Sequence, residues 1–174
     1  MKQDAGFTLV EMISVLLIVG VIAVISGMAI VTGVKGYLFS RDNATIGQNA
    51  QMAMTRICRE LMDLTTITSA TSTEISFTTT SDTLALGLDN GVIKIAEGGA
   101  GLETGDEMVD GVDNFTLTFY KVKPGGFWLV GDGVDMLKMI KVDLVLRRPA
   151  EGTTVAFSTV VNPRHTDAPG NAYY

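Results

Sequence analysis

The chain has 174 residues, a formal net charge of -6 and a mean hydropathy of +0.32. This length suits one membrane segment and one domain, and the scattered basic residues exclude a Lys/Arg run of the kind that binds nucleic acids. The single cysteine, Cys58, excludes an internal disulfide, and the single histidine, His165, excludes a histidine triad or multi-histidine metal site within one chain. We therefore expect neither an enzyme nor a nucleic-acid-binding protein.

The first element is an apolar run from Phe7 to Val31 that carries one charge, Glu11. As a helix these 25 residues span about 37 Å, which is enough to cross a bilayer with some tilt. A carboxylate at the centre of a bilayer costs roughly 2.5–3.5 kcal/mol. Glu11 must therefore either reach an interface or have a partner.

A cleaved secretory signal is the competing interpretation of this run. Such a signal has a charged region, a short apolar core and a small-residue cleavage site after the core. Here a short leader, residues 1–6, precedes the apolar run, and no Ala-x-Ala site follows at a natural distance. The order favours a retained transmembrane and assembly helix, residues 7–32.

The stretch Gly6-Phe7-Thr8-Leu9-Val10-Glu11 resembles the type III signal of type IV pilins and pseudopilins. The resemblance implies that a prepilin peptidase in the inner membrane cuts between Gly6 and Phe7 and then methylates the new amine of Phe7. Residues 1–6 would be the leader peptide, and Glu11 stands where the family has its glutamate.

A new amine on Phe7 also offers Glu11 a partner. Opposite charges about 4 Å apart attract by several kcal/mol at an intermediate dielectric, which makes a carboxylate in lipid tolerable. Glu11 lies one helical turn from its own Phe7, and the resemblance favours the amine of a neighbouring subunit, where the pair sets the stagger in a filament. The alternative is a lone glutamate on an ordinary membrane anchor.

Helical periodicity continues between Asn49 and Leu64, where apolar residues recur at spacings of three and four. These residues are Ala50, Ala53, Met54, Ile57, Cys58, Leu61 and Leu64. We expect one long helix, or nearly one, from Phe7 to Leu64, with residues 33–64 as its amphipathic continuation and Cys58 buried.

Residues 65–162 change to a period of two and predict an antiparallel β domain, covered on one face by the helix from Asn49 onward. Asn90-Gly91 between two apolar runs predicts a hairpin. The expected strands are 74–79, 83–88, 92–96, 115–119, 127–130, 140–146 and 155–161, followed by a loose tail, residues 163–174. The expected class is therefore α+β and pilin-like.

Three later segments, residues 49–61, 110–120 and 140–146, resemble J-type minor pseudopilins of type II secretion and the related W-type minor pilins. Two features depart from the wider family. Met28 stands where many members have a kinking proline, and no cysteine pair is available of the kind that major pilins use in a C-terminal loop.

The resemblance implies a minor pseudopilin that initiates or caps the pseudopilus for protein export, or alternatively a minor type IV pilin acting in pilus assembly, adhesion or DNA uptake. Its partners would be the prepilin peptidase and other pilin or pseudopilin subunits, contacted through the N-terminal helix. It would cross the bacterial inner membrane once, with the C-terminal domain in the periplasm.

Two further features of the β domain are candidates for binding. Phe127 and Trp128 follow two glycines and form either the packed face of a hairpin or an exposed contact for a partner subunit. Carboxylates in a glycine-rich loop are oxygen ligands that suit calcium, although their spacing fits no EF-hand. They are Glu103, Asp106, Glu107, Asp110 and Asp113.

Overall fold

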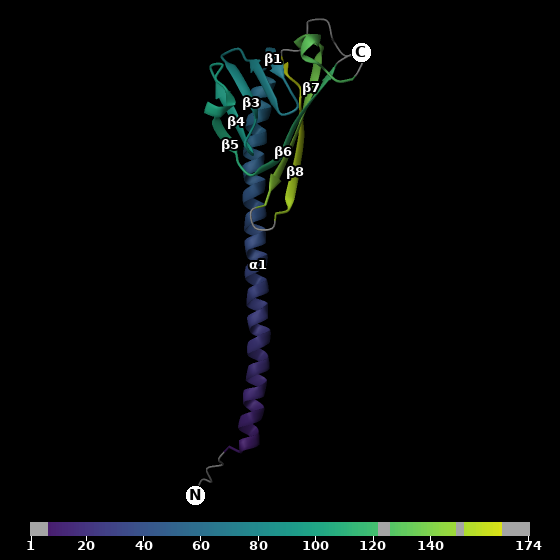
Figure 1. The fold of residues 1–174 in the computed structure, drawn as a ribbon. Coiled ribbons are helices and arrows are strands. Elements are labelled where there is room, and N and C mark those ends of the chain that lie inside the picture. The colour runs from purple at the N-terminus through teal and green to yellow at the C-terminus, as the bar shows by residue number, and fades with distance from the viewer. Residues whose placement is uncertain (1–6, 122–125, 149–151, 165–174) are drawn as a thin grey trace. The chain divides into compact units, whose positions relative to one another are not determined.

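The computed structural model describes residues 7–121, 126–148 and 152–164. One long helix is followed by antiparallel β-strands, which is the predicted α+β class (Figure 1). The chain forms two compact units, Met1–Asp42 and Asn43–Tyr174, and each is described by itself.

The helix α1 (Leu9–Met62) has 54 residues and continues through every glycine within it, so the prediction of one long helix is confirmed. In the first unit every described residue from Phe7 to Arg41 is exposed. This part contains an 18-residue window of mean hydropathy 2.8 and is long and apolar enough to cross a membrane. A helix that is apolar on all sides needs lipid or other helices around it.

In the second unit α1 is amphipathic and packs into the core of the β domain. Its buried residues are Ala50, Ala53, Met54, Ile57 and Leu61, at the spacings of three and four expected from the sequence. Cys58 was expected to be buried but is half-buried, because it packs at the margin of the core and not within it.

Five strands form the first sheet in the sequential order β1-β2-β3-β4-β5, and every neighbouring pair is antiparallel. Their bounds are β1 (Thr66–Ala70), β2 (Glu74–Thr78), β3 (Thr83–Asp89), β4 (Val92–Glu97) and β5 (Asp106–Val109). The predicted hairpin joins β3 to β4. Asn90 and Gly91 have φ values of 51° and 79°, as a two-residue type I′ turn requires.

Three longer strands form the second sheet, in the order β6-β7-β8 and again antiparallel. Their bounds are β6 (Val112–Lys121), β7 (Leu137–Arg147) and β8 (Thr154–Val161). Alternate residues of the central strand β7 are fully buried, including Ile140, Val142 and Leu144. This alternation is the period of two that predicted the strand.

Both sheets lie beside the part of α1 that belongs to the second unit (Figure 1). Residues of both sheets and of this part of α1 form one hydrophobic core. Its largest fully buried side chains include Phe77 from β2, Phe115 from β6 and Ile57 from α1. The helix therefore packs against two sheets, where the sequence predicted one.

The structure corrects the prediction of a strand at residues 127–130. Phe127 makes a single bridge with Tyr120, and the chain then turns into the short 3₁₀-helix η2 (Val130–Asp132). The turn forms because the Asp132 carboxylate accepts a hydrogen bond from the Leu129 N–H at 2.8 Å. The strands β1 and β5 were not predicted.

Two methionines of α1 offer a matched test of this packing. Met54 is 9% exposed and Met52 is 65% exposed. Met54→Ala should lower the free energy of unfolding by about 2–4 kcal/mol because it leaves a cavity, whereas Met52→Ala should change it by less than about 0.5 kcal/mol. Urea unfolding of the full chain in detergent micelles, followed by the fluorescence of the buried Trp128, measures both values. Equal losses would contradict the packing of α1.

Candidate processing and assembly site

The start of α1 is fixed by a hydrogen-bonded cap. Thr8 stands just before the helix, and its side-chain oxygen accepts a hydrogen bond from the Glu11 N–H at 3.3 Å. The carbonyl of Thr8 accepts one from the Met12 N–H at 3.2 Å. Thr8 is therefore the N-cap residue, and Thr8-x-x-Glu11 has the sequence pattern of a capping box. Thr8 was not among the predicted site residues, although this sequence pattern was a signal for it.

Glu11 lies in the first turn of α1, where the partial positive charge of the helix N-terminus favours a carboxylate. It is exposed and makes no ion pair with any other residue in the described part of the chain. The carboxylate is thus positioned close to the helix start but needs a cation from elsewhere to be neutralised in lipid.

The other two residues of the predicted site lie at the edge of the described region. Phe7 precedes the helix and is 78% exposed, and Gly6 lies outside the described residues. The predicted cut therefore falls one residue before the N-cap Thr8. Cleavage there would leave Thr8, Glu11 and the whole of α1 in the mature chain.

Beyond the cap, the exposed surface of α1 is suited to packing against other helices. A shallow hollow of about 470 Å³ lies beside Ala23, Gly27 and Val31. Ala23 and Gly27 are small residues four positions apart, a spacing that lets helix backbones approach closely within a membrane. The helix runs without a break through Met28, where many pilins carry proline.

The candidate calcium ligands are distributed over several elements: Glu103 in η1 (Leu102–Thr104), Asp106 and Glu107 in β5, Asp110 in the next turn and Asp113 in β6. Among the described residues, no group of three or more His, Cys, Asp or Glu side chains is placed to hold a metal.

Basic residues lie beside several of these carboxylates. Asp113 forms an ion pair with Arg147. Lys94 donates a hydrogen bond to Asp89 at 2.8 Å. The pKa of Lys94 is raised chiefly by that bond, with smaller contributions from Glu107 and Glu103. Calcium binding stays an untested prediction.

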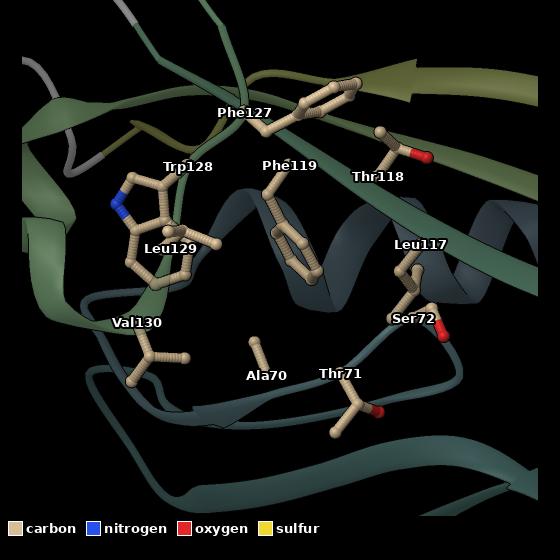
Figure 2. A pocket seen from close by; sticks show the side chains of 10 residues that line it. All are labelled: Ala70, Thr71, Ser72, Leu117, Thr118, Phe119, Phe127, Trp128, Leu129 and Val130. Atoms are coloured by element: carbon tan, nitrogen blue, oxygen red, sulfur yellow. The ribbon is translucent and has the colours of Figure 1, made fainter.

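Phe127 and Trp128 have different environments. Trp128 fits the alternative of a packed side chain, and Phe127 fits the alternative of an exposed one. Trp128 is 4% exposed, packs on Phe119 with ring centroids 5.8 Å apart, and donates from Nε1 to the Gly133 carbonyl at 2.6 Å. Phe127 is 66% exposed. Both residues line a pocket of about 280 Å³, together with Phe119, Ala70 and Val130. Figure 2 shows the side chains that line it.

A charged contact joins the end of β6 to η2. Lys121 and Asp132 form an ion pair of 2.8 Å. The hydrogen bond from Lys121, together with that from the Leu129 N–H, lowers the pKa of the Asp132 carboxyl. The pocket near Phe127 is lined mainly by carbon, and its described lining residues include no Asp, Glu, His, Cys, Lys or Arg.

Comparison with known families agrees with the N-terminal geometry. Residues 1–27 match the model of the prokaryotic N-terminal methylation motif. No curated protein and no solved structure shows significant similarity to the chain. The motif and the apolar helix together support a membrane-anchored, type IV pilin-like subunit.

The cap gives a testable role to Thr8. Thr8→Ala should speed hydrogen exchange of the Glu11 amide by about fivefold or more, because loss of an N-cap costs roughly 1 kcal/mol. Thr8→Ser keeps the acceptor and should leave exchange almost unchanged. Exchange is measured by NMR on the full chain in detergent micelles, and equal exchange in both variants would contradict the cap.

Proposed function

We propose that this chain is a pilin-like structural subunit that is processed between Gly6 and Phe7 and assembles into a filament through α1. The observation that carries the proposal is the methylation motif of residues 1–27, which includes the first part of the exposed apolar helix α1. In this proposal the prepilin peptidase removes residues 1–6 and methylates Phe7. Residues 7–32 then serve as the transmembrane and assembly helix.

The chemistry of the mature terminus supports a role for Glu11. Cleavage creates a positive amine on Phe7, beside the partial positive charge of the α1 N-terminus, which disfavours it. Glu11 in the first turn offsets this repulsion within one chain. In a filament its carboxylate pairs with the Phe7 amine of a neighbouring subunit, and the pair lowers the cost of both charges in lipid.

Within the pilin-like class we favour a minor pseudopilin of type II secretion. The three segments that resemble J-type subunits lie in one structural unit. Residues 49–61 are in the part of α1 that packs on the sheets, residues 110–120 lead into and include most of β6, and residues 140–146 belong to the neighbouring strand β7. As such a subunit, the protein initiates or caps the pseudopilus, which pushes folded substrates out of the periplasm. A cytoplasmic assembly ATPase supplies the work.

The proposal also assigns each segment of the chain to the cytoplasm, the inner membrane or the periplasm. Residues 1–6 remain in the cytoplasm until cleavage, and α1 crosses the bacterial inner membrane once. Residues 33–64 continue the helix, and residues 65–162 form the periplasmic β domain, with 163–174 as its tail. The net charge of -6 supports protein partners over nucleic acid.

Glu11 variants test the assembly step. The chain is expressed in its own bacterium, extracted in mild detergent after cross-linking, and analysed for other subunits that carry the same N-terminal motif. Glu11→Ala should reduce their recovery about tenfold or more, the effect of losing about 1.4 kcal/mol. Glu11→Asp keeps the charge, so more of these subunits should be recovered with it than with Glu11→Ala. Recovery from Glu11→Ala equal to that from the unmodified chain would contradict the role of Glu11.

Deletion of the gene distinguishes a role in the type II secretion pseudopilus from a role in a type IV pilus. Loss of protein export with pili retained supports the minor pseudopilin. Loss of pili with export retained overturns it in favour of a minor type IV pilin acting in assembly, adhesion or DNA uptake.

A further inference from the structure

The two sheets have four outer strands, and three of them are protected from pairing with another chain. β1 has five residues with a bulge between Ile67 and Ser69. β5 has four residues, begins with Asp106 and Glu107, and pairs irregularly with β4. Short length, bulges and charged residues are features that usually keep the edge strand of a sheet from pairing with another chain.

The outer edge of β6 is covered by other parts of the chain. Its Val112 N–H donates to the Gly91 carbonyl at 2.9 Å, and its Leu117 N–H donates to the Ser72 carbonyl at 2.7 Å. Further along, the Phe119 carbonyl accepts from the Trp128 N–H at 2.9 Å. Backbone contacts therefore occupy this edge near both ends of β6 and at Leu117.

The edge at β8 has none of these protections. The strand has eight residues, pairs with β7 without a bulge and contains no charged residue and no proline. Within the described part of the chain, no strand pairs with its outer side. In Figure 1 it is the strand drawn in yellow-green beside β7.

The hydrogen-bond pattern identifies which residues present their backbone outward. The Arg148 N–H donates to the Thr153 carbonyl at 2.8 Å, so Thr153 faces the β7 side. Backbone groups alternate in direction along an antiparallel strand. Ala156, Ser158 and Val160 therefore direct their N–H and C=O groups away from β7, and these residues are exposed.

A groove of about 620 Å³ lies beside β8, between this strand and the second half of α1. Its helix side includes Ala44, Gly47 and Gln51, and its strand side includes Phe157 and Thr159. All of its lining residues are uncharged, although the chain carries a net charge of -6. A charged side chain entering this groove would lose hydration without gaining a partner.

We infer that β8 accepts an extended, uncharged segment of a partner polypeptide, which adds a fourth strand to the β6-β7-β8 sheet. The backbone of the segment pairs with the outward groups of Ala156, Ser158 and Val160. Every second side chain of the segment is apolar, enters the groove and completes the burial of Phe157, which is half-buried. Strand addition of this kind obtains affinity from main-chain hydrogen bonds and specificity from alternate side chains. The inference does not depend on processing at Gly6.

A peptide with the sequence Asn-Phe-Thr-Leu-Thr-Phe-Tyr, blocked at both ends and labelled with a fluorophore, is a suitable probe. It copies Asn114–Tyr120 of β6, which is uncharged, alternates apolar with polar residues and already pairs with β7. The peptide is titrated with the full chain in detergent micelles, empty micelles are subtracted, and hydrogen exchange of the β8 amides is followed in the same samples.

Saturable binding with slowed exchange at Ala156, Ser158 and Val160 is the expected result. Ala156→Pro removes one outward N–H at a strand edge that tolerates proline, and should weaken binding about tenfold. Ala156→Thr keeps the N–H and should bind as the unmodified chain does. Gln51→Glu places a charge beside the groove and should also weaken binding.

Four results would overturn the inference. The first two are no saturable binding, and equal binding by the proline and threonine variants. The third is a dimer in micelles that Ala156→Pro dissociates, because the occupant would then be a second copy. The fourth is faster exchange of the three amides after truncation behind Arg164, because the chain's own C-terminal residues would then cover β8.

Discussion

The apolar surface of α1 from Leu9 to Val34 requires a non-aqueous environment, and every residue of that stretch is exposed within the chain itself. A long helix that is hydrophobic on all sides is stable only in lipid or among other helices. This one constraint anchors the protein to a membrane and makes neighbouring helices its natural partners. The β domain needs no such environment, because α1 from Ala50 to Leu61 buries its apolar face against both sheets.

The same apolar environment determines what Glu11 needs in order to remain charged. A charge in an apolar helix is tolerated when it is placed near the helix N-terminus and neutralised by a cation. The structure supplies the first condition through the Thr8 cap, which begins α1 three residues before Glu11. Processing at Phe7 would supply the second, because it creates an amine one helical turn away. The features of the motif are thus physically linked in the proposed processing, because the cut would create a cation beside the carboxylate of Glu11.

Sequence periodicity predicted the elements that bury a regular face. The helix, the Asn90-Gly91 hairpin and the long strands β6, β7 and β8 each carry an uninterrupted period or a specific turn. The strands β1 and β5 escaped prediction because they are short outer strands with little buried surface: Thr66–Ala70 has no fully buried residue, and Asp106–Val109 begins with two carboxylates. The division into two sheets depends on contacts distant in sequence, such as the hydrogen bond from Leu117 to Ser72, which periodicity does not encode.

The candidate site was more predictable than the surfaces of the domain. The N-terminal motif is local, so its residues could be read in order, although Thr8 was overlooked. The environments of Phe127 and Trp128 could not be separated from the sequence, because they depend on where Phe119 and Gly133 lie. The exposed edge of β8 likewise became visible only once the order of strands was known.

The most direct test of this account is the intact mass of the membrane-extracted chain, expressed with and without a prepilin peptidase. The account predicts that the peptidase removes Met1 to Gly6 and that Phe7 gains one methyl group. A chain that keeps residues 1–6, while the same peptidase processes a control prepilin, would contradict it.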